Sequence, residues 1–154
     1  MCSEAKGEAL EYLVDCYCGS GLFCLSSASS FKESIGIEIS ESSIEWARRN
    51  AESNQIDNCQ FITGDAANIF AEVKSEPAQT AVIIDPPRKG STAEFLKQLV
   101  DFRPARVVYV SCNPATQIRD LQELSETYEI SRITPFDLFP QTRHLECVVT
   151  LVAK

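Results

Sequence analysis

The sequence predicts an α/β fold, built on a doubly wound, mostly parallel sheet with an antiparallel last strand. Short apolar, β-branched runs alternate with amphipathic stretches five times along the chain, a pattern typical of a parallel sheet covered by helices on both faces. The last two apolar runs have no helical pattern between them, so the final strand can return antiparallel beside its predecessor. The 154 residues suffice for one substantial core, and we expect a single domain over residues 1–154.

Each expected strand is an apolar run that ends in polar or turn-forming residues. In chain order these strands are 12–18, 34–40, 59–66, 80–87, 105–113, 128–137 and 146–154. The amphipathic stretches that follow the first five strands predict helices at 21–30, 41–54, 67–74, 92–100 and 115–126. Ligands of such sheets bind beyond the carboxyl ends of the strands, so the residues that follow each strand are the candidates for function.

The composition limits the class of protein. No run approaches the roughly 20 apolar residues that a membrane span needs, and the first residues lack a signal-peptide core. Seven cysteines are scattered singly apart from Cys16 and Cys18. This usage favours free thiols in a reducing compartment (cytosol, nucleus or mitochondrion) over disulfides, a zinc site or an iron–sulfur cluster. The net charge of -8 argues against binding nucleic acid by charge alone.

The first strand-to-helix turn carries Gly19 and Gly21, which let a ligand approach the backbone closely. Cys24 replaces the third glycine of the dinucleotide fingerprint, so a dinucleotide is not indicated. Glu38 lies at the end of the second strand, where a carboxylate can accept both hydroxyls of a ribose, and Asp65 at the end of the third strand adds an acid near the adenine. This set predicts S-adenosylmethionine (SAM). The alternative is that the glycines only form a turn and Glu38 is a surface acid.

The fourth strand ends in Asp85-Pro86-Pro87-Arg88. The two prolines stiffen the turn and fix where Asp85 and Arg88 point. Many SAM-dependent methyltransferases carry an aromatic residue at the position of Arg88, and it stacks on a base whose amino group is methylated. The arginine therefore disfavours amino-group methylation, and the sequence must supply another way to make a nucleophile.

Cys112 follows the fifth strand, directly before a predicted helix start. Asn113 is a good N-cap and Pro114 a good first helical residue. Amide dipoles at a helix start favour the thiolate, which is the reactive species. A thiolate that adds to C6 of a uracil turns the ring into an enolate, whose C5 can attack a methylsulfonium. The alternative is a core cysteine without a chemical role.

Such a reaction also needs a base, because the C5 proton must be removed before the cysteine can leave. Glu146 starts the last strand between apolar residues, a setting that tunes a carboxylate for proton transfer, and it is the predicted base. His144 is a rival, although a lone histidine near a strand end more often has a structural or substrate-positioning role.

Four motifs in this order, DCYCGSGLF, DPPRKG, SCNPAT and FPQTRHLE, resemble the SAM-dependent RNA (uracil-5-)-methyltransferase family, and most closely its eukaryotic, fungal-type tRNA members. The resemblance runs from residue 12 to the C-terminus. It implies a Rossmann-like class I methyltransferase fold and the formation of 5-methyluridine in tRNA, with Cys112 as nucleophile and Glu146 as base. It also implies SAM contacts, at Tyr17, around Leu22, at Glu38 and at Asp85.

Members of this family are longer and have a preceding RNA-binding region. The resemblance therefore implies a catalytic domain alone, whose tRNA substrate is bound mainly by that absent region, without a metal, an iron–sulfur cluster or a membrane contact. Two other functions stay open. One is an RNA cytosine-C5 methyltransferase, which also needs a cysteine, and the other is a non-catalytic SAM-binding module that helps RNA to fold.

Overall fold

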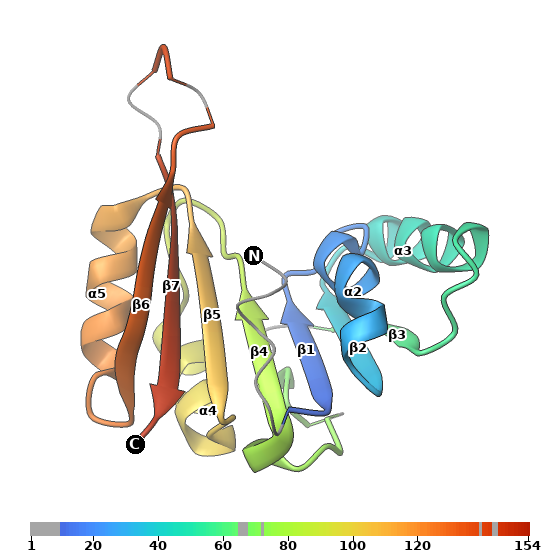
Figure 1. Cartoon of the computed structure of the whole chain (residues 1–154), viewed down its shortest axis with the longest axis horizontal. Helices are drawn as coiled ribbons and strands as arrows, with labels where there is room; N and C mark the ends of the chain where they lie inside the picture. Colours follow the sequence, from blue (N-terminus) through green and yellow to red (C-terminus); the bar gives the residue numbers. More distant parts are fainter. Residues whose placement is uncertain (1–9, 65–67, 72, 139, 143–144) are drawn as a thin grey trace.

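The computed structural model of the chain describes residues 10–64, 68–71, 73–138, 140–142 and 145–154. Within these residues, seven strands form one sheet in the order β3-β2-β1-β4-β5-β7-β6 (Figure 1). The strands are β1 (Tyr12–Cys16), β2 (Glu33–Glu38), β3 (Cys59–Thr63), β4 (Thr80–Ile84), β5 (Arg106–Ser111), β6 (Tyr128–Phe136) and β7 (Glu146–Ala153). The first five pair in parallel, and β7 runs antiparallel to both β5 and β6. The predicted doubly wound sheet with an antiparallel last strand is confirmed.

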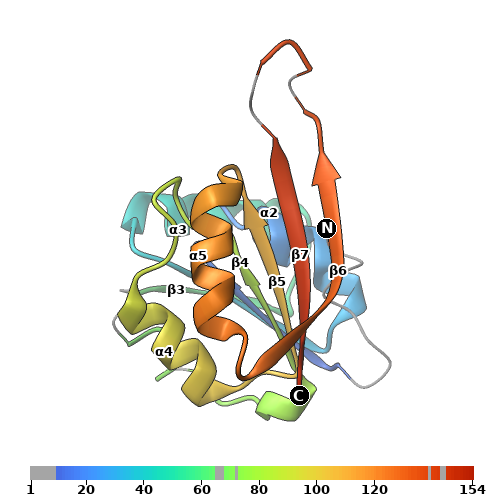
Figure 2. The ribbon, with the colours of Figure 1, turned by 90° about the vertical axis from the view of Figure 1, so that its left-hand side faces the viewer.

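Helices cover both faces of this sheet (Figures 1 and 2). The helices are α2 (Leu22–Ser27), α3 (Glu41–Ser53), α4 (Ala93–Phe102) and α5 (Pro114–Leu124), with short 3-10 turns at Ala28–Ser30 and Pro77–Gln79. On the α4 and α5 face, Phe95, Leu99 and Leu124 pack with the sheet into the main core. On the opposite face, Phe61 of β3 packs with Ala47 of α3. No helix of the described residues is long and apolar enough to cross a membrane.

The helices that follow β4 and β5 begin where the sequence predicts caps. The Thr92 hydroxyl accepts the N–H of Phe95 at 3.2 Å and starts α4. The Asn113 side chain accepts the N–H of Ala115 at 3.3 Å, and Pro114 is the first residue of α5. The cap removes one unpaired donor from the helix start and so fixes the helix directly after the Cys112 position.

Several elements are shorter than expected, for local reasons. The first strand ends at Cys16 because Tyr17 adopts a left-handed backbone conformation, and β4 ends at Ile84, before the two prolines that cannot donate ladder hydrogen bonds. The helix expected over 67–74 is absent from the described part of that segment, which forms turns closed by N–H···O=C bonds such as Ala71 to Asn68. A helix of this length is marginal unless tertiary packing supports it.

The topology defines one edge of the sheet as the place for a ligand. β1 and β4 are neighbours, and the chain winds outward from them in opposite directions, which creates a crevice at their carboxyl ends. β7 enters between β5 and β6 in the antiparallel sense, so its first residue, Glu146, lies at this same edge (Figure 1).

Candidate active site

The turn after β1 leaves its main chain open to a ligand. Tyr17, Gly19 and Gly21 have positive φ angles of 64°, 53° and 89°. A Cβ at Gly21 would lie 2.9 Å from the ring of Phe61, so glycine is needed there for the turn to pack against β3. A Cβ at Gly19 would meet nothing within 4 Å. The open space beside Gly19 is therefore where a ligand can approach the backbone.

Glu38, the last residue of β2, faces this turn. Its Oε2 accepts the N–H of Gly19 at 3.2 Å, and its Oε1 accepts the N–H of Ser40 at 3.0 Å. These bonds hold the carboxylate in place and leave lone pairs for the hydroxyls of a ribose. Next to it, a cavity of 510 Å³ lined in part by Ile37 and Ile62 is large enough for an adenine ring.

Asp15 lies fully buried in β1, beneath the turn. Its Oδ2 accepts the N–H of Cys24 at 3.3 Å, whereas its Oδ1 has no hydrogen-bond partner within the described part of the chain. Burial is the main cause that raises the pKa of Asp15 to about 8, and the nearby charges of Asp85 and Glu38 add to it. A buried oxygen without a donor is costly, so a cationic group such as the ammonium of SAM fits beside it.

Asp85 follows β4 at the point where the strand order reverses. Its side chain reaches solvent, yet the surrounding protein, and then the charge of Glu146, raises its pKa to about 6. Asp85 and Glu38 each act electrostatically on Asp15, so three acidic side chains gather at this edge of the sheet. Two of these acids have raised pKa values, and a bound cation would stabilise their ionised forms. The site therefore favours a cation, which SAM is, over an anionic dinucleotide.

Cys112 and Glu146 come from neighbouring antiparallel strands. Ser111, the last residue of β5, pairs with Cys147 of β7. Cys112 follows the first of these and Glu146 precedes the second, so both half-buried residues leave the sheet at the same place. The Ser111 hydroxyl accepts the N–H of Asn113 at 3.0 Å, which fixes the turn that carries the thiol. A thiol and a carboxylate are thus supplied from adjacent strands, as the predicted roles of nucleophile and base require.

The described members of the predicted site gather at this carboxyl edge. They are Tyr17, Gly19, Gly21, Leu22, Glu38, Asp85, Cys112 and Glu146. The ring of Tyr17 packs on that of Phe95, with the centroids 5.4 Å apart, and the side chain of Leu22 is 68% exposed at the start of α2. The remaining two candidates, Asp65 and His144, lie outside the described residues. The contacts of this set with a cofactor or substrate stay predictions.

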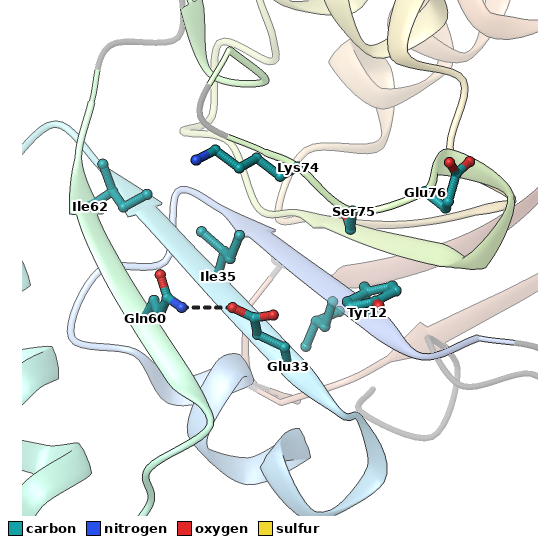
Figure 3. A pocket seen from close by; sticks show the side chains of 9 residues that line it. Tyr12, Glu33, Ile35, Gln60, Ile62, Lys74, Ser75 and Glu76 are labelled. Carbon is teal, nitrogen blue, oxygen red and sulfur yellow. Dashed lines mark hydrogen bonds between the residues drawn. The ribbon is translucent and has the colours of Figure 1, made fainter.

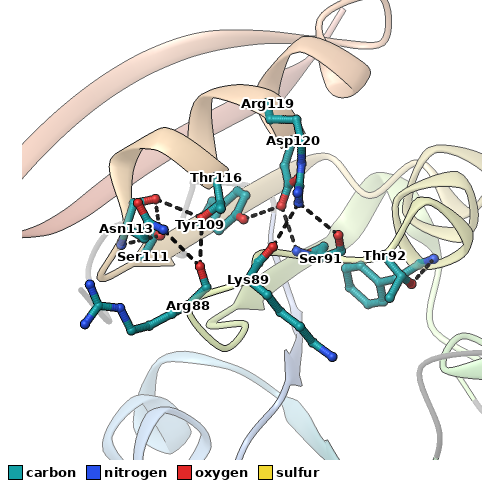
Figure 4. A network of polar contacts seen from close by, with 11 residues as sticks. Arg88, Lys89, Ser91, Thr92, Tyr109, Ser111, Asn113, Thr116, Arg119 and Asp120 are labelled. Carbon is teal, nitrogen blue, oxygen red and sulfur yellow. Dashed lines mark hydrogen bonds and ion pairs between the residues drawn. The ribbon is translucent and has the colours of Figure 1, made fainter.

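Sequence reasoning missed a polar network that joins α5 to the loop after β4 (Figure 4). At its centre, the buried carboxylate of Asp120 accepts hydrogen bonds from the Tyr109 hydroxyl at 2.6 Å and from the Ser91 N–H at 2.8 Å. A signal was present in the sequence. Gln117, Asp120 and Leu124 recur at helical spacing, so the charged residue falls on the buried face of its helix.

A second cavity, of 480 Å³, lies at the amino ends of β1, β2 and β3 (Figure 3). Tyr12, Glu33, Gln60 and Lys74 help to line it, and the Gln60 amide donates to the Glu33 carboxylate at 2.6 Å. None of the predicted site residues lines this cavity, so we assign the chemistry to the opposite edge. Across the described segments, no group of three or more His, Cys, Asp or Glu side chains could hold a metal ion.

Comparison with known proteins shows the family of the chain. Residues 2–154 match the family described as tRNA (Uracil-5-)-methyltransferase. The chain is 47% identical to the tRNA (uracil(54)-C(5))-methyltransferase of Schizosaccharomyces pombe, over 92% of the chain and 28% of that relative. It is 43% identical to the enzyme of the same name from Saccharomyces cerevisiae, over 95% of the chain and 24% of the relative. The chain therefore spans about a quarter of the length of these relatives.

Solved structures share the fold. The tRNA (uracil-54, C5)-methyltransferase of Pyrococcus abyssi, in complex with S-adenosyl-L-homocysteine, superposes with a TM-score of 0.85 at 37% identity. The match covers 98% of this chain and 36% of that one. An rRNA methylase from Streptococcus thermophilus has a TM-score of 0.76 at 16% identity, covers 99% of this chain and 91% of that one, and shows the fold alone.

We expect Asp15→Asn to stabilise the ligand-free chain increasingly as the pH rises. Between the ordinary pKa of 3.8 and the folded value of about 8, the folded chain holds a proton that the unfolded chain releases. Raising the pH through this window therefore favours unfolding of the parent chain, by up to about 1.4 kcal/mol per pH unit, and the asparagine removes this dependence. Thermal unfolding from pH 5 to pH 9 should show a gap in melting temperature that widens up to about pH 8 and then stays level.

The exposed Asp57 provides the control, since Asp57→Asn removes a carboxylate without touching a buried site. A gap that does not change with pH for Asp15→Asn, or that widens equally for Asp57→Asn, would contradict the role of burial at Asp15.

Proposed function

Because this chain belongs to the tRNA (uracil-5-)-methyltransferase family, we propose that it is the catalytic domain of an enzyme that transfers a methyl group from SAM to C5 of uridine in tRNA. The observation that carries the proposal is the emergence of Cys112 and Glu146 from adjacent strands, at the edge where the acid-rich glycine turn lies. The names of the relatives and the bound S-adenosyl-L-homocysteine of the Pyrococcus abyssi enzyme support it.

The proposed cofactor site combines an open backbone, a ribose acceptor and an acid. SAM supplies an electrophilic methyl group when it is bound. The main chain at Tyr17, Gly19 and Leu22 would line it, and Glu38 would accept its ribose hydroxyls. The unpartnered Oδ1 of Asp15 and the carboxylate of Asp85 would face its positive charges.

The proposed chemistry uses both strands beside the turn. The Cys112 thiolate forms a bond to C6 of the uracil, and the electron pair of the C5–C6 double bond moves to make an enolate. C5 then accepts the methyl group as the bond between that group and the sulfonium sulfur breaks, which leaves a neutral thioether. Glu146 removes the C5 proton, the C5–C6 double bond forms again, and the C6–S bond breaks to release the thiolate.

We further propose that binding of the tRNA depends mainly on a region outside residues 1–154. The chain spans 28% and 24% of its fungal relatives, and its net charge of -8 is poorly suited to phosphate contacts. The described cysteines are all free thiols, which supports a reducing compartment such as the cytosol, the nucleus or the mitochondrion.

Cys112→Ala should abolish a covalent complex with tRNA that contains 5-fluorouridine. Fluorine at C5 cannot leave as a proton does, so a catalyst of this kind stalls with its cysteine bound to C6. The chain is incubated with SAM and the tRNA and run on a denaturing gel beside Cys112→Ala. Cys59→Ala is the matched control, because Cys59 is a half-buried free thiol in β3 and should leave the band intact.

A band that survives in Cys112→Ala would contradict the nucleophile. If the parent chain gives no band, the assay is repeated with a longer protein that contains it. A band there means that the domain needs further RNA contacts, and its absence favours the non-catalytic SAM-binding module.

Glu146→Gln should let a methylated adduct accumulate on ordinary uridine tRNA, because addition and methyl transfer proceed while proton removal stalls. Turnover should fall by about 100-fold or more. Mass spectrometry of the protein after the reaction detects the adduct, and Glu129→Gln, at an exposed position of β6, serves as the control. Normal turnover of Glu146→Gln would remove the base assignment and bring His144 forward.

Glu38→Gln should weaken SAM binding by about tenfold or more, because a charge-assisted hydrogen bond to the ribose is replaced by a neutral one. Isothermal calorimetry of the chain with SAM measures the change. Glu41→Gln, at the exposed start of α3, changes the same chemical group nearby and should leave the affinity unaltered. Equal affinity of Glu38→Gln and the parent chain would exclude the ribose role.

A further inference from the structure

Asp120 is a buried carboxylate whose hydrogen-bond partners are all donors. Its Oδ2 accepts the Tyr109 hydroxyl at 2.6 Å and the Ser91 N–H at 2.8 Å. Its Oδ1 accepts two bonds from Arg119, at 2.9 Å from Nε and 2.6 Å from Nη2. The Asp120 side chain is 1% exposed and that of Arg119 55% exposed. A buried charge is tolerated only when its partners are placed this closely, so the geometry of the network is strongly determined.

The loop after β4 packs closely against Arg119 and Asp120. Arg119 Nη2 donates to the carbonyls of Lys89 and Ser91, at 3.1 and 3.3 Å. Gly90 lies between them with φ at 80°. A Cβ there would come within 2.5 Å of Arg119 Nη2 and 2.8 Å of Asp120 Oδ2. Only glycine lets the loop approach so closely, and the loop cannot shift without breaking several of these bonds (Figure 4).

The same loop is held against the turn that carries the thiol. The carbonyl of Arg88 accepts one bond from Asn113 Nδ2 at 3.1 Å and another from the Thr116 hydroxyl at 3.2 Å. The Arg88 side chain points away from α5, on the side of the turn formed by Ser111 and Asn113 (Figure 4). Among the residues that the structure describes, none binds its guanidinium by a hydrogen bond. Arg88 thus brings a positive charge, unpaired within the described residues, to the turn that follows Cys112, and the place of its main chain depends on the loop.

We propose that Asp120 is a positioning residue, which acts through Ser91 and Arg119 to set the place of Arg88 beside the Cys112 thiol. The loop between Arg88 and the network is short, so a displacement at Ser91 is transmitted to the guanidinium. The consequence for catalysis rests on the proposed function, because the loop also follows Asp85 and lies where a uracil would meet the thiol. The positioning itself is a property of the chain without any substrate.

The reaction of Cys112 with two small alkylating agents tests this positioning directly. Iodoacetate and iodoacetamide both react with the thiolate, forming an S–C bond and releasing iodide, but only iodoacetate carries a negative charge. The ratio of their rates at Cys112, measured by peptide mass mapping, therefore reports the positive charge near the thiol and cancels the degree of ionisation. Arg88→Gln should lower the ratio by about threefold or more. This variant gives the reference value of the ratio in the absence of the guanidinium.

Asp120→Asn should lower the ratio toward the value of Arg88→Gln. An amide has one acceptor and one donor end, so either Arg119 or the Ser91 and Tyr109 pair must face donor against donor, and the loop is released. The direction in which the rate ratio changes distinguishes the two explanations. Removing a negative charge would by itself draw iodoacetate in and raise the ratio, whereas loss of positioning lowers it. An unchanged or raised ratio in folded Asp120→Asn overturns the proposal.

Two further variants keep the test independent of folding. Asp101→Asn removes a carboxylate from the exposed Lys97–Asp101 pair on α4 and should leave the ratio unchanged. Circular dichroism verifies that each variant is folded. If Asp120→Asn does not fold, Arg119→Lys takes its place. It keeps the charge but loses the guanidinium, whose Nε and Nη2 both bond to Asp120 Oδ1 and whose Nη2 also reaches the two carbonyls. A lowered ratio therefore supports the proposal and an unchanged ratio overturns it.

A second measurement separates this inference from the proposed function. With SAM and 5-fluorouridine tRNA at saturation, Asp120→Asn should form the covalent complex more slowly than the parent chain by about tenfold or more, with the SAM affinity unchanged. Equal rates overturn the catalytic consequence. If the parent chain forms no complex under any condition, the proposed function fails, and the alkylation ratio still decides whether Asp120 positions the loop.

Discussion

The insertion of β7 between β5 and β6 is the constraint on which the candidate active site depends. Because β7 runs antiparallel, its first residue lies at the edge where the parallel strands end. The pairing of Ser111 with Cys147 then brings Cys112 beside Glu146, although the two are far apart in the sequence. A parallel β7 would carry Glu146 to the opposite edge. A slip of one residue would turn its side chain to the other face of the sheet.

The other half of the site depends on acidic groups whose charged forms the chain alone does not stabilise. Asp15 is buried with one oxygen unpartnered, and Glu38 and Asp85 both act on it electrostatically. In the ligand-free chain this arrangement costs stability. A bound cation would offset that cost, so cofactor binding and folding stability are linked. Under the proposed function, the methyl donor is a cation and the demethylated product is not, so the site attracts the donor more strongly than the product.

The fold, and the turn that carries Cys112, could be predicted because they depend on local patterns. Apolar runs define the strands, and the cap at Asn113 defines the start of α5. The placement of β7 within the sheet could not be predicted, because it depends on which edge offers the better partner for a long hairpin. The left-handed backbone conformation of Tyr17 could not be predicted either, because the turn imposes it and the intrinsic preference of tyrosine does not. The role of Asp120 could not be predicted either, because it depends on contacts with the loop around Gly90, which is distant in sequence.

The network around Asp120 has a physical rationale beyond stability. A buried ion pair gains little over an apolar core of similar volume, because its desolvation cost offsets the attraction between the charges. An apolar side chain at position 120 would fill the space beneath the loop but would bond to neither Ser91 nor Arg119. Hydrogen bonds are directional, so they fix one arrangement where apolar contacts would permit several. The polar network therefore fits a requirement for position, because it holds the loop that follows Asp85 in one place against the turn that carries Cys112.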